Sequence, residues 1–371
     1  MRLTVIATLF AQALAQMLAA QSGPQASLVS PEVHPDRTVT FRIAAPAASA
    51  VTFNGDWMPV TAQQRMTKDA SGVWSWTTAP LPPSIYLYNF TVDGIAIADP
   101  VNPRIKLRSR TSASMVEIPA DPPALWEARN VPHGTVQINW ERSKVLNGET
   151  RWIWIYTPPG YEKERARHYP VLYLFHGSND TAAGWTLVGC ANFILDNLLA
   201  ERKAAPMIVV MPYGHAVPFG APREQQATNT ALFEDYLMKD VMPLVEANYR
   251  VAPGREKRAI AGLSMGGGQS LSIGFAHPEL FSAIGAFSAA VPGDFEKRFA
   301  GILKDPDGTN ERLKAVWIGC GRQDSLFERN QKLSELLNAH QIHNTFRATE
   351  GAHTYTVWRQ YLSEFVPLLF Q

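Results

Sequence analysis

The sequence has little of what marks several broad classes of protein. Only two of its 371 residues are cysteines, Cys190 and Cys320, too few for a disulfide framework or a cysteine metal cluster. They either pair with each other or lie buried as free thiols. The 34 basic and 33 acidic residues almost cancel, so no surplus of charge indicates a nucleic acid or an anionic membrane as a partner. No cluster of potential ligands suggests a metal, and we expect no cofactor.

Long apolar runs are also absent after the N-terminus, where no stretch approaches the roughly 18 apolar residues of a transmembrane helix. Residues 1–20 differ, because a basic start precedes an apolar run that ends in small residues up to Ala20. This pattern is typical of a secretory signal peptide. We therefore expect a soluble protein that is secreted or periplasmic, with no membrane attachment after removal of the signal.

Residues 21–118 show the two-residue alternation of β-strands and no helical period. Asp93-Gly94 is typical of a tight hairpin turn. The expected strands are 38–43, 50–53, 72–77 and 85–92. Short strands at this spacing predict a small all-β immunoglobulin-like sandwich.

The pattern changes after residues 119–134, which are rich in proline and polar side chains and are predicted to form a linker. From residue 135 to 371, short apolar runs alternate with helical segments. The expected strands are 152–156, 171–175, 207–211, 258–261, 283–287, 315–318 and 345–348, and the expected helices are 191–202, 232–248, 269–276, 325–340 and 355–369. Strands without polar alternation, interleaved with helices, predict a doubly wound α/β sheet covered on both faces.

One short stretch in this second part carries a catalytic motif. Gly262-Leu-Ser264-Met-Gly266 fits G-x-S-x-G, in which a serine stands on a tight turn between a strand and a helix. The turn leaves no room for a β-carbon two positions either side of the serine, so glycine is needed there. The expected strand before it and helix after it supply the required context. We predict Ser264 as a nucleophile; the alternative is a serine that only caps a helix.

A serine hydroxyl needs a base to take its proton, and the base needs a third group to orient it. In α/β-hydrolases the chain order is serine, acid, histidine. His353 lies between an expected strand and an expected helix, where such folds assemble their sites, and it is the predicted base. Asp324 follows the expected strand 315–318 in the same way and is the predicted acid. The alternatives are that Asp324 only caps the next helix, or that Glu350 is the acid.

The negative charge that develops on an ester carbonyl oxygen needs two backbone N–H donors. One is expected from Met265, the residue after the nucleophile. The other is expected from the loop after strand 171–175, where we nominate Ser178, with Gly177 allowing close approach. His176 is expected to brace this loop and not to act as a base.

The substrate pocket is expected to be lined by Gly177, Trp185 and Phe219. Phe219 belongs to the segment 213–230, which we predict to be a long irregular loop. Long loops that follow a strand often border a site, although a surface excursion is the alternative here.

Several motifs of this part also occur together, in the same order, in a known family. The segments that carry the resemblance are 156–161 (YTPPGY), 170–177 (PVLYLFHG), 206–212 (PMIVVMP), 262–267 (GLSMGG) and 351–359 (GAHTYTVWR). They resemble the putative-esterase superfamily of α/β-hydrolases, which includes the feruloyl and acetyl-xylan esterases of carbohydrate esterase family 1, enterochelin esterase, S-formylglutathione hydrolase and the mycolyltransferases. The resemblance implies that Ser264, Asp324 and His353 form a catalytic triad. The sequence departs from its relatives at Cys190, a position usually held by arginine.

The upstream part resembles a second family. The segments that carry this resemblance are 51–57 (VTFNGDW), 72–74 (GVW), 86–94 (YLYNFTVDG) and 99–100 (DP). They are similar to an early-set module of the glycogen-binding type, carbohydrate-binding family 48. This implies that Trp57, Trp74 and Trp76 stack on sugar rings, although alternation places at least one of the last two in the core. The alternative is a module that only packs against the next domain.

Together the resemblances imply a secreted esterase that removes feruloyl or acetyl groups from a plant cell-wall polysaccharide such as xylan. Its partner is then a polysaccharide or oligosaccharide ester, with no nucleic acid or membrane. Three alternatives are an enterochelin-type siderophore esterase, an acyltransferase of the same fold, and a glycan-binding protein without activity. A strongly basic pocket favours the first of these, and an export signal argues against it.

Overall fold

The computed structural model describes residues 28–59 and 61–371. The predicted signal peptide lies outside these residues. The chain forms two compact units: the first takes the residues up to Pro82 together with Tyr88–Arg104, and the second takes Pro83–Leu87 together with Ile105–Gln371. The domain boundary predicted after residue 118 stays a prediction, and the strands that immediately precede it group with the second unit.

Two antiparallel sheets account for the upstream strands. One has the order β1-β2-β6-β5, and the other has the order β4-β3-β7-β10-β9, with β8 paired to β7. The strands are β1 (Glu32–Val33), β2 (Val39–Ala44), β3 (Val51–Gly55), β4 (Gln64–Arg65), β5 (Thr67–Lys68), β6 (Val73–Thr77), β7 (Ser84–Val92), β8 (Ile95–Ile97), β9 (Ile105–Lys106) and β10 (Ala113–Ile118).

An aromatic core joins the two sheets of the first unit. Phe41 on β2 packs against Phe53 on β3, with ring centroids 4.4 Å apart, and against Tyr88 on β7 at 4.6 Å. The predicted all-β sandwich is therefore confirmed. Trp74 is buried and its indole N–H donates to the Ala45 carbonyl, so the expectation that at least one of Trp74 and Trp76 lies in the core is also confirmed. Trp57 and Trp76 are half-buried.

The predicted linker, residues 119–134, contains no helix or strand but is fixed by hydrogen bonds to one helix, α3 (Ala191–Ala200). The side-chain amide of Asn197 donates to the carbonyls of Leu125 and Glu127 at 2.8 and 2.9 Å. The carboxylate of Asp196 accepts the Gly134 amide at 3.0 Å and lies 2.8 Å from His133 Nδ1. The segment is therefore an ordered part of the second unit, fixed along α3.

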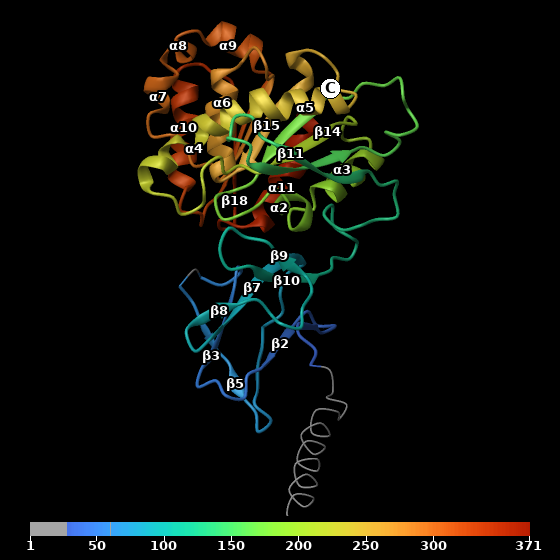
Figure 1. Ribbon diagram of the computed structural model, residues 1–371, viewed down its shortest axis with the longest axis vertical. Helices are drawn as coiled ribbons and strands as arrows, with labels where there is room; N and C mark the ends of the chain where they lie inside the picture. Colours follow the sequence, from blue (N-terminus) through green and yellow to red (C-terminus); the bar gives the residue numbers. More distant parts are fainter. Residues whose placement is uncertain (1–27, 60) are drawn as a thin grey trace, which may run out of the picture. The chain divides into compact units, whose positions relative to one another are not determined.

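The second unit is built on an eight-stranded sheet of order β11-β12-β14-β13-β15-β16-β17-β18. β11 and β12 are antiparallel at one edge, and the six strands from β13 to β18 run parallel. Figure 1 labels β11, β14, β15 and β18 of this sheet. The strands are β11 (Thr135–Arg142), β12 (Thr150–Thr157), β13 (Val171–Phe175), β14 (Ile208–Pro212), β15 (Arg258–Leu263), β16 (Ala283–Phe287), β17 (Ala315–Gly321) and β18 (Thr345–Thr349). The predicted doubly wound α/β sheet is thus confirmed.

Helices cover both faces of this sheet. Besides α3 they are α2 (Gly184–Leu187), α4 (Arg223–Tyr236), a π-helical turn (Leu237–Val241), α5 (Met242–Asn248), a 3-10 turn (Arg255–Lys257), α6 (Met265–Ala276), α7 (Phe295–Arg298), α8 (Ala300–Leu303), α9 (Pro306–Arg312), α10 (Phe327–Ala339), α11 (Tyr355–Phe365) and a final 3-10 turn (Val366–Leu368). Within residues 28–59 and 61–371, no helix is both long enough and apolar enough to cross a membrane.

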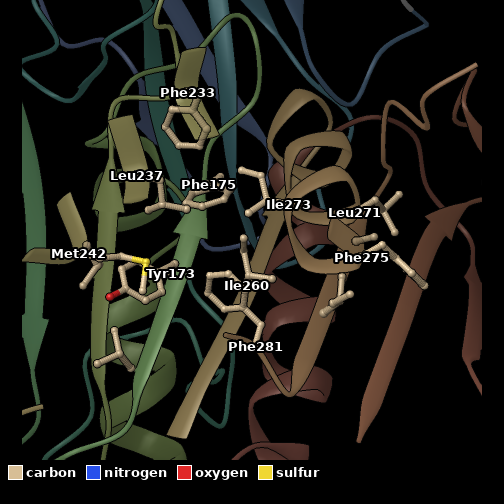
Figure 2. Packing of buried hydrophobic residues seen from close by; sticks show 14 of the residues in the cluster. Tyr173, Phe175, Phe233, Leu237, Met242, Ile260, Leu271, Ile273, Phe275 and Phe281 are labelled. Atoms are coloured by element: carbon tan, nitrogen blue, oxygen red, sulfur yellow. The ribbon is translucent and has the colours of Figure 1, made fainter. Parts of the chain in front are cut away.

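Each face of the sheet has its own apolar core. On one face, Phe175 of β13 and Ile260 of β15 pack with Phe233 of α4 and Leu271 of α6, as Figure 2 shows. On the other face, Leu174 of β13 packs in a cluster with side chains of α3 and α11. Burial on both faces explains why inner parallel strands such as β13 and β16 consist of apolar and aromatic residues, whereas the edge strand β18 keeps polar residues.

Two expectations for this unit are corrected. The segment 213–230 is not one long loop, because α4 already begins at Arg223. The first two turns of α4 are polar, with Asn229 as their buried residue, and so have no apolar period that could reveal a helix. The edge strand β11 was not expected either, because both of its faces keep exposed residues such as Trp140, which is 65% exposed.

Candidate active site

Ser264 stands between the last residue of β15 and the first residue of α6. Its backbone has φ 54° and ψ −115°, a conformation that residues other than glycine rarely adopt. The Ser264 amide donates to the Phe287 carbonyl at 2.8 Å, and the Ser264 carbonyl accepts the amides of Gly268 and Ala290 at 3.0 and 2.9 Å. These bonds hold the strained turn and fix the position of the Ser264 hydroxyl.

The two motif glycines are needed because backbone passes close to each. A β-carbon on Gly262 would lie 2.5 Å from the carbonyl group of Gly266, and one on Gly266 would lie 2.6 Å from the His176 carbonyl oxygen. No side chain can shift to relieve either contact, since the obstructing atoms are backbone. The turn therefore brings the start of α6 directly against the end of β13.

Three loops bring Ser264, His353 and Asp324 together. His353 follows β18 and precedes α11, and its Nε2 lies 3.0 Å from Ser264 Oγ. Asp324 lies between β17 and α10, and its Oδ2 is 2.7 Å from His353 Nδ1. The Asp324 side chain is fully buried, whereas that of His353 is 37% exposed. Such a chain can pass the serine proton to an imidazole whose tautomer the carboxylate sets.

Asp324 orients His353 and also holds the turn before α10, whose N-cap is Leu326 and carries no side-chain cap. Its second oxygen, Oδ1, accepts the Leu326 amide at 2.9 Å just before α10 begins. Burial acts to raise the pKa of Asp324, but the hydrogen bond and charge of His353 and the Leu326 amide outweigh it and lower the pKa below its usual value. Glu350, the alternative acid, is 78% exposed and instead accepts the side-chain amide of Gln323.

The loop after β13 lies beside the nucleophile. A β-carbon on Gly177 would stand 2.8 Å from Leu263 Cδ1 and 3.2 Å from Ser264 Cβ, so a side chain here would crowd the nucleophile. Ser178 is the next residue, and its carbonyl accepts a hydrogen bond from His215 Nε2 at 2.7 Å. Met265 is the first residue of α6, and amides in a first helical turn have no partner within the helix.

His176 is buried and braces this loop. Its Nε2 accepts the Gly214 amide at 2.8 Å, so its Nδ1 carries the proton and donates to the Gly177 carbonyl at 2.8 Å. Burial lowers the pKa of His176 to about 4, against a smaller opposing effect of Asp180. The ring is therefore a neutral link between the loops after β13 and β14.

Acidification is expected to destabilise the fold partly through His176. Its pKa is about 4 when folded and near 6.5 when unfolded, so the unfolded chain binds the extra proton first. Stability from this group is therefore full above pH 6.5 and falls as the pH drops from there toward 4. In His176→Asn, the loss in free energy of unfolding between pH 7 and pH 4.5 should be smaller by about 2 kcal/mol. Urea unfolding at the two pH values measures it, and an equal loss in both proteins contradicts this role.

The three residues expected to line the substrate pocket lie in different surroundings. Trp185 is corrected, because it is fully buried and its indole N–H donates to the Phe175 carbonyl at 2.9 Å, so it belongs to the core. Gly177 lies at Ser264 as described above. Phe219 is half-buried and packs edge-on against His215, with ring centroids 5.5 Å apart. Phe219 is therefore linked through His215 to the Ser178 carbonyl.

Sequence reasoning did not single out three further residues near these loops. Asp180 lies in the loop after β13, Tyr355 is two residues after His353, and Lys106 comes from β9. Asp180 Oδ2 lies 2.7 Å from the Tyr355 hydroxyl and 3.0 Å from Lys106 Nζ. The sequence held one signal for Lys106, since cations occupy every second position from Arg104 to Arg110.

Neither a metal site nor a disulfide is found in the described part of the chain. No group of three or more His, Cys, Asp or Glu side chains there could hold a metal ion. Cys190 and Cys320 are both buried and form no disulfide with each other. Of the two alternatives for the cysteines, the structure has the buried thiols.

Sequence comparison relates the chain to esterases. Residues 143–369 match the model of a family described as "Putative esterase". An endo-1,4-beta-xylanase/feruloyl esterase of Xylanibacter ruminicola is 31% identical over 351 residues, which cover 92% of this chain and 46% of that protein. An acetyl esterase of Caldicellulosiruptor saccharolyticus is 24% identical over 223 residues, 52% of this chain and 80% of that protein. The chain spans about half the length of the first curated relatives it matches.

Solved structures agree with this relationship. A family 1 ferulic acid esterase of Anaeromyces mucronatus, in complex with ferulic acid, matches with a TM-score of 0.57 and 25% identity over 66% of this chain and 93% of that one. An enterochelin esterase of Shigella flexneri matches with a TM-score of 0.67 over 90% of this chain and 92% of that one. Its identity is 20%, so this second likeness is one of fold.

Proposed function

We propose that this chain, which belongs to the putative esterase family, is a carboxylic ester hydrolase in which Ser264 is the nucleophile, His353 the general base and Asp324 the group that orients the base. One observation carries the assignment. Ser264 Oγ, the His353 ring and the Asp324 carboxylate form a continuous chain with distances of 3.0 and 2.7 Å. The buried carboxylate accepts from Nδ1–H and leaves Nε2 free to accept the serine proton.

In the first half of the reaction, Ser264 Oγ attacks the ester carbonyl carbon as its proton passes to His353 Nε2. The carbonyl oxygen becomes an oxyanion, which the amides of Met265 and Ser178 are placed to bind. The positive end of the twelve-residue helix α6 also points toward this charge. The tetrahedral intermediate then collapses, His353 gives its proton to the leaving alcohol oxygen, and the acyl group stays on Ser264.

In the second half, a water molecule takes the place of the alcohol. His353 removes a proton from the water as its oxygen attacks the acyl carbon, and the same two amides bind the second oxyanion. Collapse releases the carboxylic acid and returns the proton to Ser264. The 37% exposure of the His353 side chain is consistent with access of water to Nε2.

The substrate we propose is a feruloyl or acetyl ester on a plant cell-wall polysaccharide such as xylan. The relatives support this, since one is a xylanase/feruloyl esterase, one is an acetyl esterase and one structural neighbour holds ferulic acid. The half-buried Phe219, next to His215, is an aromatic surface suited to a feruloyl ring. Release of such esters fits a secreted enzyme, and the predicted signal peptide supports secretion or residence in the periplasm.

A siderophore esterase is the second candidate. The likeness to an enterochelin esterase extends over 90% of the chain, beyond the residues that match the family model. Its substrate is an anionic trilactone, for which cations such as Arg110, over the ring of Phe219 at 5.1 Å, offer a partner. An acyltransferase would differ from both in preferring an added sugar acceptor to water.

A comparison of four substrates separates these functions. We expect hydrolysis of methyl ferulate or acetylated xylan with a kcat/KM at least about 10-fold above that for a catecholate trilactone, because pocket contacts discriminate substrates by such factors. 4-Nitrophenyl acetate reports the ester chemistry alone. Faster turnover of the trilactone replaces the sugar-ester proposal with the siderophore one, and failure to react with a fluorophosphonate points to a protein without hydrolytic activity.

A further inference from the structure

A buried ion pair adjoins the candidate active site. Lys106 Nζ lies 3.0 Å from Asp180 Oδ2, and the two side chains are only 8% and 4% exposed. The Tyr355 hydroxyl donates to the same oxygen at 2.7 Å, and Lys106 Nζ stands 4.7 Å from the centre of the Tyr355 ring. The carboxylate therefore holds a cation and a phenol in a region closed to water.

This ion pair connects three separate segments. Lys106 is on β9, and Ser109, in the same hairpin, donates to the Asp180 carbonyl at 3.1 Å. Asp180 is two residues after Ser178 in the loop that follows β13. Tyr355 is the first residue of α11 and is two residues after His353. The loop with the oxyanion donor and the loop with the base are thus tied to each other and to an upstream hairpin.

We propose that Lys106 is a positioning residue of the ester-hydrolysing site, which acts by holding Asp180 and Tyr355, and with them Ser178 and His353, in the geometry that the reaction needs. The inference rests on the proposed roles of Ser264 and His353. Lys106 lies outside residues 143–369, so the site extends beyond the segment that the family model matches.

The geometry indicates an effect on the rate more than on binding. Ser264 is held independently, through its backbone bonds to Phe287 and Ala290. When Lys106 is lost, the buried Asp180 carboxylate remains without its cation, and the two loops around it should move to solvate its charge. Ser178 and His353 then shift relative to a nucleophile that stays in place. Displacements near 1 Å can lower a rate by about 100-fold.

A matched control distinguishes positioning from plain stabilisation. Asp240 is also a buried aspartate, 7% exposed, and accepts the Ser143 hydroxyl at 2.6 Å and the Val145 amide at 3.1 Å, away from the catalytic loops. Asp180→Asn and Asp240→Asn make the same chemical change in two buried networks. Both are expected to lower the unfolding temperature, but only the first should lower kcat.

The experiment measures kcat and KM for 4-nitrophenyl acetate in the full chain, with thermal unfolding of each variant. In Lys106→Met we expect kcat to fall by about 10- to 100-fold, with KM within about threefold. Lys106→Arg, which keeps the charge, should recover most of the rate. Asp180→Asn should behave as Lys106→Met does, and Asp240→Asn should keep its kcat within about twofold.

The outcomes separate this inference from the function on which it rests. A wild-type protein without activity on 4-nitrophenyl acetate overturns the proposed function. An active wild type whose folded Lys106→Met variant keeps its kcat, or whose Asp240→Asn variant loses rate equally, overturns the positioning role alone. If Lys106→Met does not fold, Lys106→Arg and the isosteric Asp180→Asn decide by the same measure.

Discussion

Replacing Ser264 with alanine is expected to lower kcat for 4-nitrophenyl acetate by about 10⁴-fold or more, because the atom that forms the acyl-enzyme is removed. The fold should remain, since the Ser264 side chain makes no capping hydrogen bond to α6 and the turn is held through backbone bonds. Circular dichroism and thermal unfolding check the fold, and initial rates check the activity.

Ser363→Ala is the matched control for this variant. The Ser363 hydroxyl donates to the Gln360 carbonyl within α11, at 2.7 Å, and has no part in the proposed reaction. Its removal should leave kcat within about twofold. A fluorophosphonate should label the wild type and Ser363→Ala but not Ser264→Ala. Full activity or labelling of Ser264→Ala shows that another residue is the nucleophile.

The candidate triad was predictable because each member has a local signal. Ser264 lies in a five-residue motif, and the run before it and the helix after it are visible in the sequence. His353 and Asp324 each follow an apolar run, and parallel strands bring their carboxyl ends to one edge of the sheet. Position along the chain therefore implied proximity in space. The strands β13 and β16 have the predicted bounds because each is a short, uniformly apolar run.

The surroundings of the triad were not predictable in this way. A tryptophan near a motif can line a pocket or lie in the core, and the local sequence does not distinguish the two. Trp185 lies in the core, where its indole N–H donates to the Phe175 carbonyl ten residues away. The Lys106–Asp180 pair joins residues far apart in sequence, and the run of alternating cations that contains Lys106 gives no sign of its partner. Such contacts are decided by tertiary packing, which local propensity does not encode.

The helix α4 illustrates the same limit within the fold. Of its fourteen residues only Asn229, Phe233 and Tyr236 are buried, so its first half has no apolar period. What holds that half is Asn229, whose side-chain oxygen accepts the amides of Ala216 and Val217 at 2.8 and 3.1 Å. From the sequence alone, a polar residue such as Asn229 is assigned to a loop, because its hydrogen bonds to the neighbouring loop are not visible there. Because α4 begins at Arg223, the irregular segment after β14 is limited to the residues before it.

Replacing Asp324 with asparagine is expected to lower kcat by about 10⁴-fold while the fold persists. Oδ1 accepts the Leu326 amide at 2.9 Å, so the asparagine oxygen should keep that place and preserve the turn before α10. Its NH₂ group then faces His353 Nδ1, where Oδ2 now lies at 2.7 Å. An N–H donor at this position makes Nδ1 the acceptor and puts the imidazole proton on Nε2. The base can then no longer accept the proton of Ser264.

Glu350→Gln tests the competing assignment with the same carboxylate-to-amide change. Glu350 is 78% exposed, pairs with Arg322 at 3.7 Å and lies in the same loop as His353. Its kcat should stay within about twofold of the wild type, since an exposed pair contributes little to either stability or geometry. The two variants are compared by kcat for 4-nitrophenyl acetate and by unfolding temperature. A large loss of kcat in Glu350→Gln with a small loss in Asp324→Asn would reverse the roles of the two acids. If the two variants have equal unfolding temperatures, a loss of kcat confined to Asp324→Asn is due to the tautomer of His353 and not to unfolding.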